Sequence, residues 1–384
     1  MRGQTGDDRA VRSAWLEIDL DAIAHNLRET RKLVGPKVGI IAIAKCNAYG
    51  HGAVAVVRRC VAEGAEMIAV ALLQEAVELR EAGIEAPLLV LGAADPEEAP
   101  GFVKYGVTPT VTSVEFARAL SCAAEAVGRT APAHVKIDSG MGRQGLRPED
   151  LAGFGEVLRA LPGVQVDGVF SHFACAPGDC EYTAVQARTF ASAARDLESA
   201  VGRPIGLRHV CNTGGILQHS EAHLDAVRPG ALLYGIGTRE VGDGHPDARP
   251  AMSLKARIVF TKCVRRGDSV GYNRTFVAER DTCAAILPLG YGDGYPRTLS
   301  NNAEVLVHGT RCPVVGLVSM DCTVVDVSAV PRVQIGDEAV LLGAQGEDLI
   351  SAGELAQRAG TVVQEIVARM SVRLPRVYKG GETA

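Results

Sequence analysis

Short apolar runs alternate with amphipathic segments from about residue 38 to residue 234. Each of the eight runs is followed by a segment whose apolar residues recur at helical spacing. Apolar strands that alternate with amphipathic helices are typical of a parallel sheet that is buried on both faces. The expected strands are residues 38–44, 67–71, 88–91, 108–111, 133–137, 164–170, 207–210 and 226–228. Eight such units predict an α/β fold, a (β/α)8 TIM barrel, with a doubly wound open sheet as the alternative.

The helices between these strands are predicted from apolar spacing and from stop signals. The expected helices are residues 22–33, 53–62, 74–82, 96–103, 114–127, 149–160 and 182–200, with shorter turns at 216–219 and 231–234. Asp21 is a suitable N-cap for the first helix, and Gly35 with Pro36 ends it. Just before that helix, residues 15–20 alternate between apolar and polar, as a half-buried strand does.

The pattern changes in a polar stretch between Thr238 and Pro250. Beyond it, short strands are expected at 253–260, 284–288, 303–308, 310–314, 322–327 and 338–342, and helices at 351–358 and 361–369. Turns rich in glycine and aspartate separate these strands, which is typical of a small β domain. We therefore expect a barrel at residues 14–240 and a mainly β domain at 250–384, which the strand at 14–20 could join.

Charge and composition argue against several classes of function. The net charge is −5, from 40 basic and 45 acidic residues that are mixed along the chain. Such mixing provides neither a basic surface for nucleic acid nor a polybasic patch for a membrane. No apolar run approaches the roughly 18 residues that span a bilayer, and the polar N-terminus does not resemble a signal peptide. Ten cysteines without CxxC spacing indicate buried thiols in a reducing compartment, the cytoplasm, rather than disulfides or a metal site.

A lysine ends the first apolar run. Residues 40–44 are apolar, and Lys45 follows them directly, with Tyr49 and His51 close behind. A lysine at the mouth of a buried strand is costly unless it is paired, snorkels to water or is used in chemistry. This stretch by itself favours a snorkelling lysine as much as one that forms an imine with a carbonyl cofactor.

The ends of the other strands favour chemistry. In a barrel of this kind, active sites lie at the carboxyl ends of the strands. Besides Lys45, polar or ionisable residues follow strand five at 138–143, strand six at 171–173, strand seven at 211–215 and strand eight at 228–230. Five of the eight strands therefore deliver such groups to one rim, and chance is a poor explanation for that placement.

The segment 140–145 matches the GxGxxG pattern of dinucleotide-binding sites. That fingerprint belongs after the first strand of its sheet, with an acidic residue about 20 residues further on. Here it follows the fifth expected strand and contains Arg143. A glycine-rich turn that directs Arg143 into the rim is the simpler interpretation.

Two loops on neighbouring strands are candidates for binding phosphate. One is Asn212-Thr213-Gly214-Gly215 and the other is Pro229-Gly230-Ala231. Backbone N–H groups with a hydroxyl bind phosphate, commonly in the last two loops of such a barrel, although each loop taken singly is more often only a turn. Together with an imine-forming lysine, the two loops indicate a phosphorylated aldehyde, for which pyridoxal 5'-phosphate is the candidate.

The β domain contributes residues 289–295 and 318–321. Glycines flank Tyr291 on both sides, which leaves its phenol approachable, although a tight β-turn would explain the same glycines.

Taken together, these segments resemble the alanine racemase family. The shared segments are, in family order, residues 44–52, 136–143, 171–174, 212–213, 228–230, 290–294 and 319–321. Seven ordered motifs make the resemblance specific, and it covers roughly residues 15–378. Cys46 stands where alanine is common in the family.

The resemblance implies a head-to-tail homodimer with shared active sites. Each site would take its barrel from one subunit, and Tyr291 and Met320 from the other. Lys45 would hold pyridoxal phosphate and act as the base on the D-face, while Tyr291 would be the base on the L-face. Two bases are required because the α-proton leaves one face of the carbon and a proton returns to the other.

The remaining implied roles concern binding. Arg143 and the backbone of Met320 would hold the amino-acid substrate, and Arg228 would face the pyridine nitrogen of the cofactor. The other cofactor contacts would come from Tyr49, His172, Asn212, Thr213, Gly230 and Ala231. The implied reaction interconverts L-alanine and D-alanine and would supply D-alanine for cell-wall peptidoglycan.

Two positions bear on how closely this chain follows the family. Val372 stands where some members carry a tyrosine that shapes the substrate pocket, so a serine racemase or one of broader specificity is the alternative. Lys136 matches a lysine that is carbamylated in some members.

Two further hypotheses compete with a racemase. A decarboxylase on a related barrel would carry a glycine triplet and a cysteine–aspartate pair, whereas Asp321-Cys322 has the reverse order. A non-catalytic carrier of pyridoxal phosphate would need only a barrel, and a second domain that holds Tyr291 argues against it.

Overall fold

The computed structural model describes residues 12–237 and 247–381. The chain divides into two compact units, Asp21–Arg249 and Met1–Leu20 together with Pro250–Ala384. Residues 238–246, which form most of the expected boundary, lie outside the described residues.

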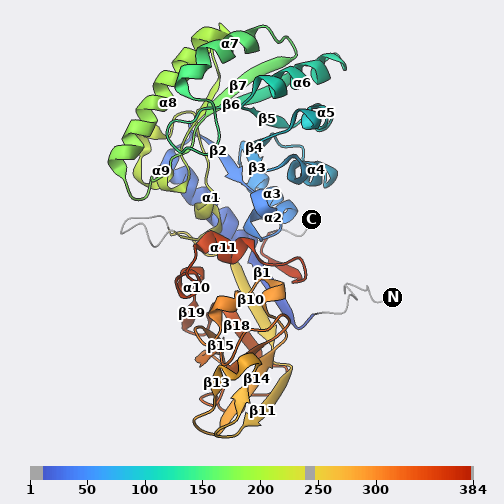
Figure 1. Ribbon diagram of the computed structural model, residues 1–384, viewed down its shortest axis with the longest axis vertical. Helices are drawn as coiled ribbons and strands as arrows, with labels where there is room; N and C mark the ends of the chain where they lie inside the picture. Colours follow the sequence, from blue (N-terminus) through green and yellow to red (C-terminus); the bar gives the residue numbers. More distant parts are fainter. Residues whose placement is uncertain (1–11, 238–246, 382–384) are drawn as a thin grey trace. The chain divides into compact units, whose positions relative to one another are not determined.

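In the first unit, eight described parallel strands form a closed barrel (Figure 1). They are β2 (Gly39–Ile43), β3 (Met67–Val70), β4 (Leu88–Ala93), β5 (Thr108–Val111), β6 (Ala131–Lys136), β7 (Val164–Phe170), β8 (Leu207–His209) and β9 (Ala226–Val227). The barrel closes where β2 pairs with β9, with Gly39 opposite Ala226. The predicted TIM barrel is therefore confirmed, and the open sheet is wrong.

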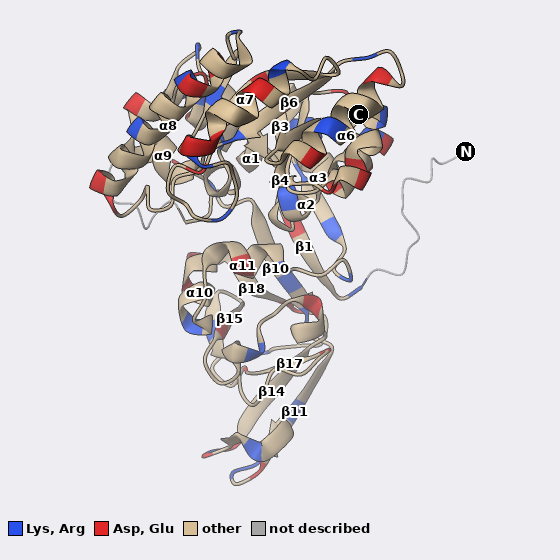
Figure 2. Cartoon of the chain, turned by 45° about the horizontal axis from the view of Figure 1, so that its top comes forward, with Lys and Arg blue, Asp and Glu red and all other residues tan. Residues whose placement is uncertain are grey.

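Helices surround the barrel; α1 precedes its first strand in the chain, and the others follow strands. They are α1 (Leu20–Val34), α2 (Lys45–Tyr49), α3 (Ala53–Ala62), α4 (Leu73–Glu81), α5 (Ala99–Tyr105), α6 (Val114–Glu125), α7 (Leu151–Arg159), α8 (Cys180–Val201) and α9 (Thr213–Gln218). Side chains cap several of them: Ser113 accepts from the N–H of Phe116, and Asp179 accepts from that of Tyr182. Figure 2 shows charged residues on outer helices such as α6, α7 and α8. These helices thus face the strands with apolar residues and water with charged ones.

The barrel strands carry buried polar side chains as well as an apolar core. Ile41, Ile43, Ala69, Leu89 and Ala226 form one buried apolar cluster. His134 and Lys136 on β6 and His209 on β8 are also buried. Buried polar groups are costly unless they are hydrogen-bonded. These three side chains therefore indicate a part of the barrel interior that serves function as well as packing.

The second unit consists mainly of β-sheet. Its larger sheet has the order β16 (Thr310–Pro313), β15 (Glu304–Val307), β18 (Glu338–Gln345), β10 (Met252–Arg257), β1 (Ala14–Asp19) and β20 (Arg376–Lys379), and β19 (Asp348–Ile350) pairs with β18. A smaller sheet contains β11 (Phe260–Val264), β14 (Thr282–Leu287) and β17 (Thr323–Asp326). The hairpin β12 (Ser269–Val270) and β13 (Phe276–Val277), and helices α10 (Ala352–Ala359) and α11 (Val363–Ala368), complete the unit. The first strand of the chain lies here, because β1 pairs with β10 and β20.

One strand predicted in this unit is wrong. Residues 253–260 were expected to form a single strand, but β10 ends at Arg257 and β11 begins at Phe260. The two strands belong to different sheets, since β10 pairs with β18 and β11 pairs with β14. Ile258 is buried between them, so the apolar pattern continues through the break and conceals it.

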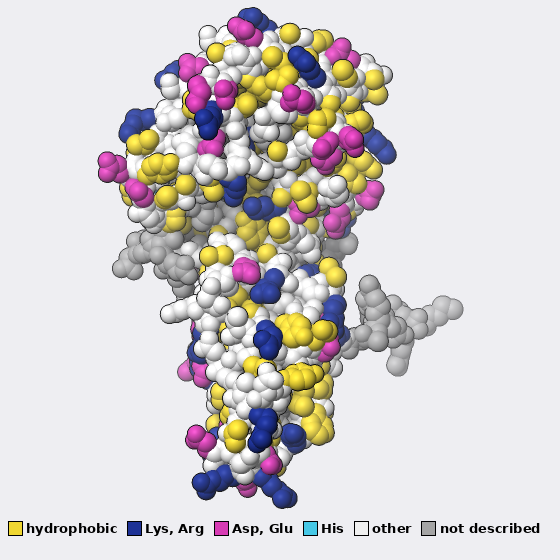
Figure 3. Space-filling model, viewed as in Figure 1, with side chains coloured by type: hydrophobic (Ala, Val, Ile, Leu, Met, Phe, Trp, Pro, Cys, Tyr) yellow, Lys and Arg dark blue, Asp and Glu magenta, His cyan; other side chains and the backbone are white. Residues whose placement is uncertain are grey.

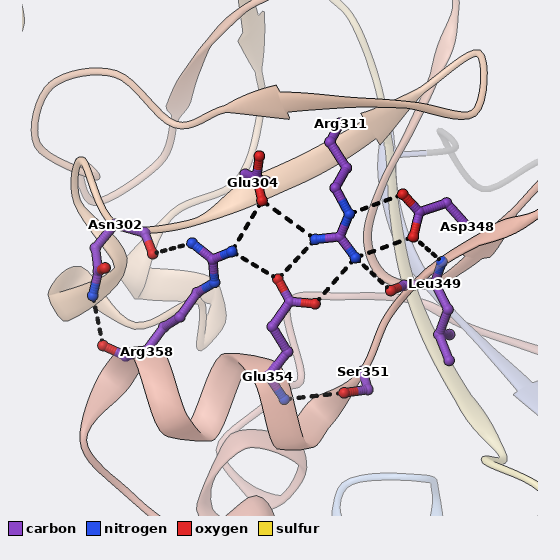
Figure 4. A network of polar contacts seen from close by, with 8 residues as sticks. All are labelled: Asn302, Glu304, Arg311, Asp348, Leu349, Ser351, Glu354 and Arg358. Atoms are coloured by element: carbon purple, nitrogen blue, oxygen red, sulfur yellow. Dashed lines mark hydrogen bonds and ion pairs between the residues drawn. The ribbon is translucent and has the colours of Figure 1, made fainter.

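A network of charged side chains joins α10 to three strands of the larger sheet (Figure 4). Arg311 on β16 donates to Asp348 through Nε (2.8 Å) and to Glu354 through Nη1 (2.9 Å). Arg358 donates to Glu304 on β15 (2.9 Å). Hydrogen bonds from Arg311 to Asp348 and Glu354 raise the pKa of the guanidinium above its ordinary value. Ion pairs that share side chains cost less side-chain entropy per pair than isolated pairs do. This network is therefore the best candidate for electrostatic stabilisation at the surface of the second unit.

The surface carries mixed charge. On the face drawn in Figure 3, basic and acidic side chains are interspersed over each unit. No helix within residues 12–237 and 247–381 has the length and hydropathy to cross a bilayer.

Candidate active site

A cavity of about 300 Å³ lies at the carboxyl ends of the barrel strands. Four of the predicted site residues line it, namely Lys45, Arg143, His172 and Arg228, and Lys136 joins them. The rest of the lining comes from Ala71, Leu72, Leu91, Gly92, Ala93, Gln144 and Phe170. The cavity is therefore lined by residues at or just after the carboxyl ends of six different strands, and Lys45, Arg143, His172 and Arg228 lie at the rim where the sequence predicts them.

Lys45 begins a turn of unusual backbone conformation. Cys46, Asn47, Ala48 and Tyr49 all have φ of 52 or 53°, which is the left-handed region. Left-handed helical geometry costs roughly 1–2 kcal/mol for each non-glycine residue, and strain of this kind persists only where the surroundings enforce it. The sequence gives no sign of this turn.

Side-chain acceptors hold that turn. Asn47 Oδ1 accepts from the N–H of Ala53 (2.7 Å), and Glu75 accepts from the N–H of Cys46 (2.5 Å). Glu75 also accepts from the N–H of Ala71 (2.8 Å), so one carboxylate joins the turn to the end of β3. Because the turn is fixed at both ends, it sets the directions in which Lys45 and Tyr49 leave the backbone.

Arg228 is a buried cation whose hydrogen bonds fix its orientation. Its Nη1 donates to His209 Nδ1 (2.6 Å), and its Nη2 donates to the carbonyl of Ser171 (2.6 Å) and to His172 Nδ1 (3.2 Å). Further donation goes to the carbonyls of His209 (2.9 Å) and Val210 (3.0 Å). Burial lowers the pKa of Arg228 to about 10, so the side chain still carries its charge at neutral pH.

The histidines around Arg228 form a neutral chain. Because Arg228 donates to Nδ1 of His209, the proton of the neutral ring is assigned to Nε2. That nitrogen faces Nδ1 of His134 at 3.0 Å. Burial, and then Arg228, lowers the pKa of His134 to about 4 and that of His209 well below its ordinary value. The same two causes lower the pKa of His172 well below its ordinary value, so all three rings are neutral at pH 7.

The cavity has a positive character. Burial and the neighbouring cations Arg143, Arg228 and Lys45 together lower the pKa of Lys136 to about 8. These four side chains line the cavity together with His172, and after burial their charges lower the pKa of its ring. A cleft lined by one sign of charge concentrates ligands of the opposite sign, so an anionic ligand is expected here.

A second predicted group, in the loops after β2, β8 and β9, forms a cradle of hydroxyl and backbone N–H groups. Thr213 Oγ1 accepts from the N–H groups of Gly230 (3.3 Å) and Leu232 (3.2 Å). A Cβ atom added to Gly230 would lie 3.0 Å from Tyr49 Oη, so glycine is what allows Tyr49 to approach this loop. Burial, followed by the charge of Cys46, raises the pKa of Tyr49 to about 12, which keeps its hydroxyl a donor.

The other residues of this group shape the two loops. Asn212 Oδ1 accepts from the N–H of Gly215 (3.1 Å) and so caps α9, and Ala231 begins a single 3-10 turn, Ala231–Tyr234. The residues suit a phosphorylated aldehyde, because phosphate needs N–H and O–H donors and a buried arginine can face a ring nitrogen.

Tyr291 and Met320 lie together in the second unit. The N–H of Tyr291 donates to the carbonyl of Ser319 (3.0 Å), and the N–H of Gly292 donates to that of Met320 (2.9 Å). Both predicted side chains are accessible, with 38% of Tyr291 and 53% of Met320 exposed. A Cβ atom at Gly290 would collide with the Ser319 carbonyl. Glycine at this position therefore allows the loop of Tyr291 to approach the backbone of Ser319, in addition to leaving the Tyr291 phenol uncrowded.

A buried carboxylate holds this loop, and it is not among the site residues predicted from the sequence. Asp293 is fully buried and accepts from the N–H of Gly290 (3.1 Å) and from Arg12 (2.7 Å). Hydrogen bonds from Arg12 and Gly290 outweigh burial and lower the pKa of Asp293 below its ordinary value. The aspartate inside the glycine-rich motif was the available signal. The sequence offers no comparable signal for Glu75, His134 or His209.

Comparison with known proteins identifies the family. Models of the N-terminal and C-terminal domains of alanine racemase match residues 18–238 and 251–378. An alanine racemase from Desulforamulus reducens is 43% identical, over 95% of this chain and 99% of that protein. The crystal structure of an alanine racemase from Bacillus anthracis with bound L-Ala-P has a TM-score of 0.92 at 35% identity, covering 97% of this chain and 96% of the other. A histidine racemase from Leuconostoc mesenteroides has a TM-score of 0.89 at 28% identity, covering 98% and 100%. The chain therefore belongs to the alanine racemase family, whose members are amino-acid isomerases.

Proposed function

We propose that this protein is a pyridoxal-phosphate-dependent racemase that interconverts L-alanine and D-alanine. The observation that carries the proposal is the barrel cavity, which gathers Lys45, Arg143, His172 and Arg228 in a chain of the alanine racemase family. The positive character of the cavity supports an anionic cofactor and a substrate carboxylate.

The cofactor would lie between the cradle and the buried arginine. Tyr49, Thr213, Gly230 and Ala231 would hold the phosphate, and Lys45 would hold the aldehyde carbon. Asn212, beside Thr213, would be a further cofactor contact. When bound, pyridoxal phosphate withdraws electrons from the α-carbon of the amino acid and makes its proton removable. The permanent positive charge of Arg228 would keep a facing ring nitrogen unprotonated, which restrains electron withdrawal and disfavours transamination. His172, neutral and bonded to Arg228, would lie beside the ring.

Two bases would then move the proton. Lys45 would remove or return it on the D-face, and Tyr291 would do so on the L-face. Arg143 and the backbone of Met320 would hold the substrate carboxylate, so that the α-carbon stays between the bases. Lys136, whose pKa of about 8 leaves part of its amine neutral, would be able to react with carbon dioxide to form a carbamate that orients Arg143.

We also propose a head-to-tail homodimer with shared sites. Each barrel would receive Tyr291 and Met320 from the second unit of the other subunit. The exposure of both side chains on one loop pair supports this arrangement. In the cell, the enzyme would act in the cytoplasm and supply D-alanine for peptidoglycan.

A racemase of broader specificity, or a serine racemase, is the second candidate. Val372 is 86% exposed and lacks the hydroxyl that a tyrosine would bring to the substrate pocket. The likeness to a histidine racemase indicates that this fold accommodates other side chains.

Optical rotation distinguishes the candidates. Purified protein loaded with pyridoxal phosphate would be given each enantiomer of alanine, serine and lysine, and decay of the circular-dichroism signal would be followed. Rapid decay for both alanine enantiomers, and slow decay for the others, is the expected result. Comparable decay for serine favours the broader enzyme, and no decay with any of them contradicts a racemase.

A further inference from the structure

Two exposed cysteines face each other across β11 and β14 in the second unit. The strands are antiparallel, and their register pairs Cys263 directly with Cys283. Both thiols are exposed and unbridged, and Figure 1 shows the two strands side by side. Directly paired residues of antiparallel strands project from the same face of the sheet, so the two thiols share one solvent-exposed face.

The spacing of such a pair suits a disulfide. Directly paired residues have Cα atoms about 4.5–5.5 Å apart, and disulfides join Cα atoms about 4.4–6.8 Å apart. The Cβ atoms of a strand pair lie about 4.5–5.5 Å apart, whereas a disulfide requires about 3.5–4.5 Å. A small approach of the two strands, without rearrangement of the fold, would therefore close the bond.

Electrostatics agrees with this pairing. Partial burial, then the carboxylate of Asp326 and Cys263, raise the pKa of Cys283 above its ordinary value. Cys122, on α6, is also exposed, but it lies on a helix and has no cysteine in register with it, so it provides a matched control.

We propose that Cys263 and Cys283 form a reversible disulfide, a redox modification site in the β domain. The oxidant is a low-molecular-weight disulfide of the glutathione class. Exposed or strained disulfides are readily reduced again by small thiols, so the bond is a transient modification and not part of the stable fold, as cytoplasmic disulfides usually are.

The reaction proceeds by two thiol–disulfide exchanges. Either thiol can make the first attack and its partner the second, for example Cys263 and then Cys283. Cys263 loses its proton, bonds to one sulfur of the small disulfide and releases the other sulfur as a thiolate. Cys283 then loses its proton and attacks the Cys263 sulfur, which releases the second small thiolate. The protein loses two hydrogen atoms, and the small disulfide is reduced to two thiols.

Peptide mapping tests this proposal. The full-length holoenzyme is incubated with oxidised glutathione, digested without reduction and analysed by mass spectrometry. The same is done for Cys263→Ser, Cys283→Ser and the control Cys122→Ser. We expect a cross-linked Cys263–Cys283 peptide in the wild type and in C122S, and a glutathione adduct on the remaining cysteine in C263S and C283S. Cys122 in the wild type should carry only a glutathione adduct, and excess reduced glutathione should remove the cross-link.

Three results would overturn the proposal. One is glutathione on both cysteines of the wild type without a cross-linked peptide. A second is modification of Cys122 while both paired thiols stay free. The third is a cross-link that joins two chains, which a non-reducing denaturing gel detects as a covalent dimer. Racemase activity should be retained in C263S and C283S, because neither side chain belongs to the proposed machinery.

Discussion

Acidification should destabilise the protein through its buried, neutral histidines. In the folded state burial, and then Arg228, lowers the pKa of His134 to about 4, whereas an unfolded histidine titrates near 6.5. Between these values the unfolded chain binds a proton that the folded chain does not. The free energy of unfolding therefore falls as the pH falls from about 6.5 to about 4, and the His134 contribution amounts to about 3 kcal/mol.

His134→Asn isolates this contribution. The asparagine Oδ1 can take the place of Nδ1 as the acceptor for His209, which lies 3.0 Å away, but it does not titrate. Urea unfolding of the holoenzyme, followed by far-UV circular dichroism at pH 7.5 and at pH 4.5, gives the stability lost on acidification. The variant should lose about 2–3 kcal/mol less than the wild type over this range.

The control for this measurement is His308→Asn. His308 has 45% of its side chain exposed and lies 3.0 Å from Asp337 in the second unit. Its removal leaves His134 unchanged, and a histidine beside a carboxylate does not lose stability on acidification as a buried neutral ring does, so this variant should lose at least as much stability as the wild type. Equal losses for H134N and the wild type would refute the assignment of His134 as a buried neutral ring. A smaller loss for H308N as well would show that the effect is not specific to the barrel interior.

Further substitutions test the proposed chemistry and the fold. Lys45→Ala should abolish the visible absorbance of the lysine-bound cofactor, and a persistent band in a purified, dialysed sample would contradict the lysine assignment. Tyr291→Phe should slow deuterium exchange at the α-carbon of L-alanine roughly 10²–10⁴-fold, with a much smaller effect on D-alanine. Tyr272→Phe, at a residue 72% exposed in the same unit, should change neither rate, and equal losses with both enantiomers in Y291F would count against two bases. Arg311→Met should lower the free energy of unfolding by about 1 kcal/mol, because Asp348 loses its cation and Glu304 and Glu354 keep only Arg358. Arg280→Met removes a single pair whose arginine is 62% exposed and should cost under about 0.5 kcal/mol. Similar urea midpoints for the two variants would rule out a contribution from the network.

The barrel could be predicted from the sequence because its strands are short apolar runs separated by amphipathic helices. The strand at 164–170 and the helix at 53–62 match β7 and α3 in both bounds. The gathering of Lys45, Arg143, His172 and Arg228 was predictable as well, since parallel strands bring their carboxyl ends to one rim.

Other features depend on contacts that no local pattern encodes. The left-handed turn after Lys45 is held by Glu75 from another element, and nothing in the residues 46–49 requires it. His134 and His209 lie on different strands with no motif around them, and only the fold joins His134 to His209 and His209 to Arg228. The end of β10 could not be predicted because the buried residue Ile258 continues the apolar pattern at the point where the chain passes from one sheet to the other.

Complementation between subunits tests most directly whether the racemase site is shared. Lys45→Ala and Tyr291→Phe subunits, each inactive by itself, would be mixed under conditions that allow subunit exchange, and the heterodimer would be verified by mass. A shared site predicts that the heterodimer holds one complete site, with Lys45 from the Y291F subunit and Tyr291 from the K45A subunit. With random exchange, about half of the dimers are mixed and each has one of two sites intact, so about a quarter of the wild-type alanine racemase activity should return. No regained activity in a verified heterodimer would contradict the shared site.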